Sequence, residues 1–238
     1  AFLAGPYNGT DMNSSLLQSN VIPLVEPYTA LGYMFVNGGG ETTTSAALDP
    51  AGTFFDVVDW VVLEVRAPIA PSIVLASQAC LLHRNGVVTD QAGIDAPQFS
   101  LPIGPYHIAL RHRNHLGVMT AAPLEVDSIT GVTVAFQLPA TPTFGTNARQ
   151  ITGGVACLWP GDVHQDGTIM YTGGGNDRDP ILQRIGGTLP TATAFGYHQE
   201  DVNLDGAVRY TGGGNDRDPI LQVIGGSVPT AVRHQGLP

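Results

Sequence analysis

Carboxylate and amide side chains recur at alternate positions in two closely similar stretches near the C-terminus. The first stretch reads DVHQDGTIMYTGGGNDRDPILQRIGG from Asp162, and the second reads DVNLDGAVRYTGGGNDRDPILQVIGG from Asp201. The two copies lie 39 residues apart (201 − 162), and a period of about 20 to 50 residues marks a repeated supersecondary unit. Side-chain oxygens at this spacing are the ligands that calcium prefers, so the repeat predicts two calcium-binding loops.

The second copy follows the opening of an EF-hand calcium loop. Asp201, Asn203 and Asp205 occupy positions 1, 3 and 5, and a glycine follows at position 6. Their side-chain oxygens would converge on the ion, and Ala207 would add its backbone carbonyl from position 7. Position 12, where an EF-hand has glutamate, is Gly212, so a later carboxylate must close the loop.

Asp216 and Asp218 are the two candidates for the closing ligand. Asp218 precedes Pro219, which is also the pattern of a helix N-cap with proline at the first helical position. A following pair of glycines would end this short helix. We therefore favour Asp216 as ligand and Asp218 as cap, and a ligand role for Asp218 stays open.

The first copy has a weaker set of ligands. Asp162 and Asp166 are in place, but position 3 is His164, and calcium prefers oxygen to a neutral imidazole nitrogen. We expect binding through water there, or lower affinity than in the second loop. The further candidates in this copy are Thr168, Asp177 and Asp179. The alternative interpretation is a pair of polar turns without metal.

A calcium loop, a short helix and a close second copy resemble a type I dockerin duplication. The variant YTGGGNDRDPIL is similar to C-terminal repeats of secreted Bacteroidota surface proteins that are often labelled hemagglutinin or dockerin-like. Upstream, GPYNGTDMNSSLL, IPLVEPYTALGY, VDWVVLEVR and RHRNHLGVMTA resemble the β-rich module that precedes those repeats. The resemblance implies an extracellular, calcium-stabilised, structural or adhesive protein without established catalysis. His164 departs from the family pattern.

Composition limits the classes of partner. The 238 residues carry a net charge of −10, and all ten basic residues are arginine. Acidic residues concentrate in the repeats, where bound cations would relieve their repulsion. The chain has no basic footprint for nucleic acid and no apolar run that could span a membrane. It begins at Ala1 without a charged signal segment, so we expect a mature exported protein, extracellular or at the cell surface.

Short alternating segments with Gly and Pro between them fill the upstream part of the chain. We predict an antiparallel β-sandwich, mainly β, because helical periodicity is almost absent there. Asn85-Gly86 predicts a type I′ hairpin. The apolar segment 2–7 could be an edge strand or an extended arm. The predicted strands are 57–66, 73–83, 106–113 and 132–138; the predicted domains are the sandwich at 1–158 and the tandem dockerin-like repeats at 159–238, with copies at 162–192 and 201–231.

Two further features concern covalent modification. Cys80 and Cys157 form a disulfide in an exported protein, or they are two buried free thiols, and sequence alone does not separate these alternatives. Asp127-Ser128-Ile129 fits a short signal for O-glycosylation in Bacteroidota, which makes Ser128 a candidate glycan site.

A polar cluster follows the third predicted strand. Its members are His107, Arg111, His112, Arg113, Asn114 and His115. An enzyme could use such groups as a base and as anion-binding arginines, but no nucleophile lies near in sequence. We therefore favour the interpretation that these side chains hydrogen-bond to neighbouring loops at a strand end.

Three functions remain, and an enzyme comes last. The first is a calcium-stabilised structural subunit that forms a homo-oligomer or polymer, such as a filament, in which segment 2–7 adds to the sheet edge of a neighbour. The second is an adhesin or carbohydrate-binding module. The third is a dockerin-like module that binds a different protein.

Overall fold

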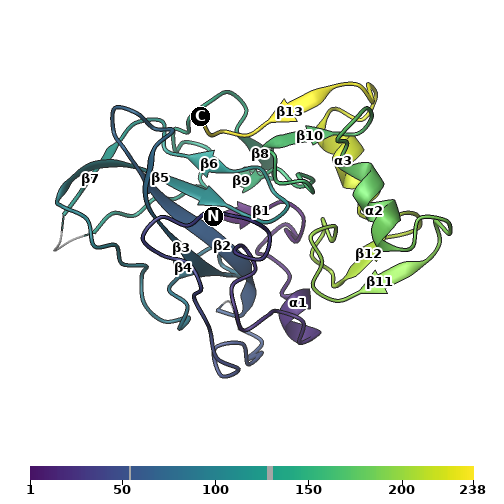
Figure 1. The fold of residues 1–238 in the computed structure, drawn as a ribbon, viewed down its shortest axis with the longest axis horizontal. Coiled ribbons are helices and arrows are strands. Elements are labelled where there is room, and N and C mark those ends of the chain that lie inside the picture. The colour runs from purple at the N-terminus through teal and green to yellow at the C-terminus, as the bar shows by residue number, and fades with distance from the viewer. Residues whose placement is uncertain (54, 128–130) are drawn as a thin grey trace.

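The computed structural model describes residues 1–53, 55–127 and 131–238, and the protein is mainly β, as predicted (Figure 1). The longest strands fall where apolar and β-branched residues are densest. The strands are β1 (Phe2–Leu3), β2 (Val57–Arg66), β3 (Val74–His83), β4 (Val88–Thr89), β5 (Gly104–Arg111), β6 (Val118–Met119), β7 (Leu124–Val126), β8 (Arg149–Thr152), β9 (Val155–Leu158), β10 (Thr168–Met170), β11 (Thr193–Phe195), β12 (Ala207–Arg209) and β13 (Val232–His234); the helices are α1 (Ser15–Gln18), α2 (Arg178–Arg184) and α3 (Arg217–Val223).

The largest sheet contains six strands in the order β4-β3-β2-β5-β6, and β7 pairs with β5 outside this row. All of its pairs are antiparallel. Its three long strands β2, β3 and β5 confirm the strands predicted near 57–66, 73–83 and 106–113. Strand β2 lies at the centre and is buried along almost its whole length, because side chains cover both of its faces.

Two local predictions in this sheet are wrong. Residues 132–138 form no strand: the chain turns there, and the N–H of Leu138 donates to the carbonyl of Ala135. The hairpin at Asn85-Gly86 exists, but only Gly86 has positive φ, at 82°, whereas a type I′ turn needs positive φ at both central residues. The His83 N–H donates to the carbonyl of Val87 and closes a three-residue loop, in which Gly86 has the left-handed conformation.

A smaller sheet has the order β1-β9-β8. Strand β1 pairs in parallel with β9, with Phe2 opposite Cys157 and Leu3 opposite Leu158, so the β module is not wholly antiparallel. Phe2 and Leu3 are buried in their own chain. Of the two alternatives for segment 2–7, the structure shows the edge strand over Phe2–Leu3, and burial of these apolar side chains holds it on its own chain.

One core joins the two sheets. Trp60 and Leu81 from the large sheet and Leu3 and Leu158 from the small sheet belong to the same buried apolar cluster. Cys80 and Cys157 also lie in this core, and both are free thiols, so no disulfide joins the two parts of the chain in this structure. Burial raises the pKa of the Cys157 thiol to about 11, which keeps it protonated and unreactive.

The repeats form a lobe beside the sheets and exchange strands with one another (Figure 1). Strand β10 of the first repeat pairs with β13, which follows helix α3, while β11, which follows helix α2, pairs with β12 of the second repeat. Each repeat is therefore completed by the other. Their shared core includes Ile169, Ile181, Val208 and Ile220, together with Leu116 from the β module.

The two repeat helices α2 and α3 end as predicted, at glycines with positive φ that include Gly225 and Gly226. None of the helices in the described ranges has the length and apolar character needed to cross a membrane. The candidate glycan site Ser128 lies outside the described residues.

Candidate functional site

The second candidate calcium loop, which begins at Asp201, places two aspartates inside the protein. The side chain of Asp201 accepts hydrogen bonds from the backbone N–H groups of Asp205 (3.1 Å) and Gly206 (2.8 Å), which curls the loop around it. Gly206 has φ of 86°, a conformation that suits glycine at position 6 of the loop. Asp201 is fully buried, so the loop presents a carboxylate that is shielded from water.

Asp216 reaches into the same loop from just before helix α3. Its carboxylate accepts backbone N–H groups of Val202 (2.8 Å), Asn203 (3.3 Å) and Arg209 (2.8 Å). It too is fully buried. These bonds come from both ends of the loop, so the Asp216 carboxylate links its two ends; its role as a calcium ligand stays a prediction.

The first copy repeats this arrangement atom for atom. Asp162 accepts the N–H groups of Asp166 and Gly167 (both 3.1 Å). Asp177 accepts those of Val163 (2.8 Å), His164 (3.3 Å) and Met170 (2.8 Å). Asp162 and Asp177 are 5% and 1% exposed. The two loops therefore have the same pattern of hydrogen bonds, although the residues at position 3 differ.

Each loop buries two carboxylates that form no direct ion pair within the described part of the chain, although the charge of the Arg113 guanidinium acts, against the larger effect of burial, to lower the pKa of Asp201. None of the ion pairs in the described residues involves Asp162, Asp177, Asp201 or Asp216. Burial, and then the charge of Asp201, raise the pKa of Asp216 to about 8. Burial, and then the charges of Asp177 and Asp166, raise the pKa of Asp162 to about 7. The ionised pairs are thus unfavourable by themselves, and a divalent cation would favour them.

Asp179 and Asp218 lie elsewhere. Asp218 is the second residue of α3, so it is not the N-cap that we predicted. The side chain of Asn215 takes that role: its Oδ1 accepts the Asp218 N–H at 2.9 Å and its Nδ2 donates to the Asp218 carboxylate at 2.9 Å. Arg217 also pairs with Asp218 at 2.8 Å. Asp179 has the matching contacts with Asn176 and Arg178, so both carboxylates are engaged outside the loops.

The remaining predicted ligands lie at the loop surface. Asp205 pairs with Arg209 at 2.6 Å, and Asn203 Nδ2 donates to the carbonyl of Gly214 at 2.8 Å. In the first loop, Asp166 accepts the Thr168 N–H at 2.9 Å, and the His164 ring nitrogen lies 3.3 Å from the carbonyl of Asn176. Ala207 and Thr168 begin strands β12 and β10, where position 7 would offer its carbonyl.

No three His, Cys, Asp or Glu side chains in the described part of the chain lie together as a ready-made metal centre. Each loop has two buried carboxylates. In the second loop the other ligands of an EF-hand set would be the Asp205 carboxylate, the Asn203 amide and the Ala207 backbone carbonyl. The residues fit calcium in donor type and in loop conformation. Asp205 would have to turn from Arg209 to the ion, because it engages that guanidinium here.

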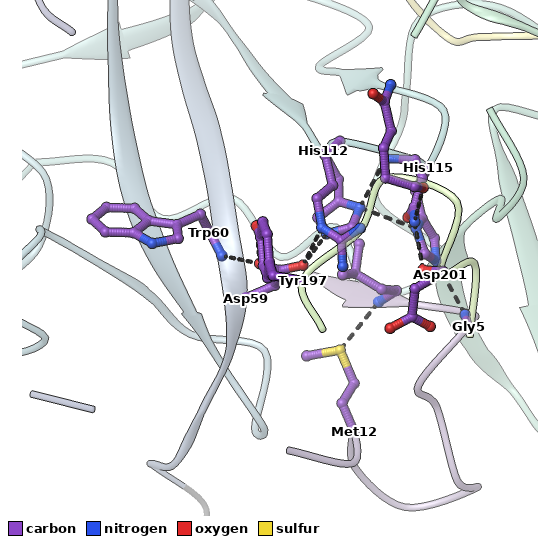
Figure 2. Close-up of polar contacts among 12 residues, drawn as sticks. Gly5, Met12, Asp59, Trp60, His112, His115, Tyr197 and Asp201 are labelled. Atoms are coloured by element: carbon purple, nitrogen blue, oxygen red, sulfur yellow. Dashed lines mark hydrogen bonds and ion pairs between the residues drawn. The ribbon is translucent and has the colours of Figure 1, made fainter. Parts of the chain in front are cut away.

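A loop of the β module, residues 112–115, contacts both candidate calcium loops. Figure 2 shows two of its side chains, His112 and His115, with the hydrogen bonds that they make to Asp59 and Gly5. Asn114 Nδ2 donates to the carbonyl of Asp201 at 2.6 Å, and its own carbonyl accepts the N–H of Asp162 at 3.1 Å. Gln165 of the first loop donates to the carbonyl of Arg113 at 2.8 Å. The first residue of each calcium loop is thus bonded to the same asparagine.

A buried ion pair anchors this loop to the central strand. Arg113 Nε donates to Asp59 of β2 at 2.9 Å, and both side chains are fully buried. Tyr197 donates its hydroxyl to the same carboxylate at 2.6 Å, and the Arg113 guanidinium lies 4.4 Å from the Tyr197 ring centre. Burial alone would raise the pKa of Asp59, but Arg113 and the hydrogen bond from His112 lower it to about 2. Asp59 therefore stays ionised.

His112 and His115 are neutral members of this network. His115 Nε2 accepts the N–H of Gly5 at 3.1 Å, so the proton is on Nδ1, which donates to Asn114 Oδ1 at 2.8 Å. His112 Nε2 donates to Asp59 at 3.0 Å. Burial lowers the pKa of both rings, and for His115 the nearby His112 and Arg113 add to the shift. His107 lies apart and contacts Thr120.

The contacts of residues 112–115 confirm that the polar cluster bonds neighbouring loops at a strand end. Sequence reasoning missed which loops these are, and it missed Asp59 and Tyr197 altogether. The available signal was a run of four polar residues directly after an apolar strand, because such a run is buried only where partners meet it.

No family model matches the chain, and no match was found among the curated proteins or the solved structures that were compared with it.

Proposed function

We propose that this chain is an extracellular, calcium-stabilised structural module, a mainly antiparallel β-sandwich followed by a dockerin-like pair of calcium repeats. The observation that carries the proposal is the buried pair of aspartates in each repeat, Asp162 with Asp177 and Asp201 with Asp216, which form no direct ion pair among the described residues. The second loop has an oxygen ligand at position 3 and binds the ion more tightly.

The energetic argument concerns charge. Removing two carboxylates from water costs several kcal/mol each, by order of magnitude, unless a counter-charge accompanies them. Backbone N–H groups supply part of that compensation in both loops. A calcium ion supplies the rest, and its binding free energy adds to the free energy of folding.

Calcium also has a mechanical effect in this proposal. The ion fixes the conformation of each loop, and both loops are bonded to Asn114 of the β module. Filling the loops therefore stabilises the docking of the repeats on the sheets. A protein outside the cell meets millimolar calcium, which even weak extracellular modules of about 10⁻⁴ to 10⁻³ M affinity bind.

The same proposal includes self-assembly into an oligomer or filament. The contact between copies differs from the one predicted from the sequence. Strands β1 and β8 (Arg149–Thr152) are the two outer strands of their sheet; β1 is buried in its own chain, whereas Ile151 of β8 is 56% exposed. Such an edge can add a strand from a neighbour. Negative-stain electron microscopy with calcium and with chelator checks this: fibres that vanish in chelator support it, and single particles in both conditions refute it.

The calcium proposal is tested by thermal unfolding of the full chain with calcium, with magnesium and with excess chelator. We expect a melting temperature that rises with the logarithm of calcium concentration and responds weakly to magnesium, which demands stricter octahedral geometry. Equal melting temperatures in calcium and chelator would refute the proposal.

A further inference from the structure

A polar groove lies on the β module, away from the calcium loops. Its volume is about 490 Å³, within the range of about 300 to 1,000 Å³ that small-molecule sites occupy. Strand β3 supplies one wall, the segment 37–41 supplies a second and the segment 98–100 supplies a third. Nothing in the calcium proposal uses this groove.

The groove presents uncharged groups that both donate and accept hydrogen bonds. The amides of Asn37, Gln78 and Gln98 and the hydroxyl of Ser100 line it. Each amide nitrogen has one bond within the chain, to the carbonyl of Leu75 (3.2 Å), to Gln91 Oε1 (3.3 Å) and to the carbonyl of Ala96 (3.1 Å), respectively. Each amide therefore keeps a second N–H and its oxygen for a ligand.

Glu41 and Phe99 complete the lining. Glu41 accepts the Gly39 N–H with Oε1 (2.9 Å), while its buried Oε2 has no hydrogen-bond partner within the described residues. Phe99 is half-buried and packs against the cluster of Val65, Tyr106 and Ile108, which fixes its ring. The groove thus joins an apolar ring to amide and carboxylate oxygens.

The wall formed by residues 36–38 is held rigidly. Val36 accepts the Ser77 N–H at 2.8 Å, and its own N–H donates to Ser77 Oγ at 2.8 Å. A Cβ on Gly38 would lie 2.1 Å from the Ser77 carbonyl oxygen, so only glycine allows this approach. A preformed wall lowers the entropy cost of binding.

We propose that this groove binds a neutral carbohydrate of roughly one or two sugar rings. A sugar hydroxyl donates and accepts at once, as the free amide groups do, and an apolar sugar face stacks on an aromatic ring. None of the lining residues is Lys, Arg or His, and Glu41 repels anions, so a phosphate or an acidic sugar is disfavoured. An apolar ligand would leave the amides and Glu41 unpaired.

The test is saturation-transfer difference NMR and calorimetry on the full chain in calcium buffer. The probes are maltose, cellobiose, lactose and N,N′-diacetylchitobiose, with digalacturonate as the anionic comparison. We expect at least one neutral disaccharide to bind, and digalacturonate to bind at least tenfold more weakly than that disaccharide. Binding of none of the four neutral sugars at millimolar concentration, or preference for digalacturonate, would overturn the proposal.

Matched variants locate the site. Gln98→Ala removes an exposed groove amide, and Gln222→Ala removes an exposed amide from the end of α3 in the repeats. Loss of hydrogen bonds to one amide should weaken binding about tenfold, with no change for Gln222→Ala. Combining Gln78→Ala with Gln98→Ala should weaken it further, while the melting temperature reports that the chain still folds. Equal affinities in all variants would refute this location.

Discussion

The side-chain amide of Asn114 lies 2.6 Å from the carbonyl oxygen of Asp201, the first residue of the second candidate calcium loop. Its backbone carbonyl accepts the N–H of Asp162, the first residue of the other candidate loop, at 3.1 Å. One residue of the β module thus contacts both loops where they begin. If calcium binds as we propose, its effect on either loop reaches this asparagine, so we expect metal binding and the docking of the repeats to be coupled.

Replacing Asn114 should loosen the docking of the repeats. Asn114→Ala leaves the carbonyls of Gln199 and Asp201 without their side-chain donor, which should cost about 2 kcal/mol of unfolding free energy. Asn13→Ala, which removes an exposed amide contact, should cost less than about 0.5 kcal/mol. Urea unfolding in calcium measures both. Equal effects would show that the Asn114 contacts contribute nothing particular.

The two aspartates near α3 should differ in their effect on calcium. Asp216→Asn removes a buried charge from the second loop, so calcium affinity should fall at least about tenfold there. Asp218→Asn alters a half-exposed group that pairs with Arg217, so calcium affinity should not change. Calcium titration followed by calorimetry compares them. A larger loss in Asp218→Asn would make Asp218 the closing ligand.

The first loop should improve when it receives an oxygen ligand. His164→Asn copies Asn203 of the second loop, so the affinity of the first site should rise on the order of tenfold. His198→Asn, at a half-buried histidine whose ring contacts the carbonyl of Phe195, is the matched control without a predicted effect. Calorimetry on both variants decides whether position 3 limits the first site. An unchanged first site in His164→Asn would contradict the loop assignment.

The buried pair of Arg113 and Asp59 should matter more than a surface pair. Arg113→Met leaves Asp59 as a buried charge without its cation and should cost about 3 to 5 kcal/mol. Arg184→Met breaks a pair with Glu200 in which the arginine side chain is 42% exposed, and should cost less than about 1 kcal/mol. Chemical denaturation measures both free energies. If the two losses were alike, the buried network would not anchor the repeats.

Stability without calcium should fall as pH rises. The pKa of Asp177 and Asp201 is raised to about 6, of Asp162 to about 7 and of Asp216 to about 8. A carboxyl whose folded pKa lies above its unfolded value of about 3.9 contributes stability below that value, and the contribution is lost as pH rises towards 8. Urea unfolding in chelator between about pH 4 and about pH 8 should show this decline.

Calcium should reverse the trend, because it favours the ionised carboxylates and competes with protons for them. The titration of His112 and His115 also makes the stability of the chain rise with pH. Their pKa is lowered in the folded chain, so stability is present above the unfolded pKa of about 6.5 and falls as pH drops below it. Asp162→Asn combined with Asp216→Asn should flatten the decline in chelator. If the slope of stability against pH is the same with and without calcium and in the double variant, the assignment of these carboxylates is refuted.

The strongly patterned parts of the fold could be predicted from the sequence. Strands β2, β3 and β5 were predictable because each is a run of eight or ten residues rich in apolar and β-branched side chains. The duplicated loops were predictable because Asp201, Asn203 and Asp205 have a fixed spacing. In contrast, residues 132–138 are apolar in part but form a turn, since hydrogen bonds and not composition decide between strand and turn.

The long-range relationships could not be predicted. The pairing of β10 with β13 joins residues more than sixty positions apart, and no local pattern encodes that choice. Likewise, Tyr197 meets Asp59 across 138 positions. The polar type of His112 or Asn114 indicated hydrogen bonding, but the identity of the partner depends on how the repeats dock.

Calorimetric titration of calcium into the chelator-treated, dialysed full chain tests the central claim most directly. The account predicts two ions per chain, with the tighter one lost in Asp216→Asn and the weaker one lost in Asp177→Asn, because each substitution removes a carboxylate buried in one loop. A chain that stays folded by circular dichroism yet takes up no calcium at millimolar concentration would contradict the account.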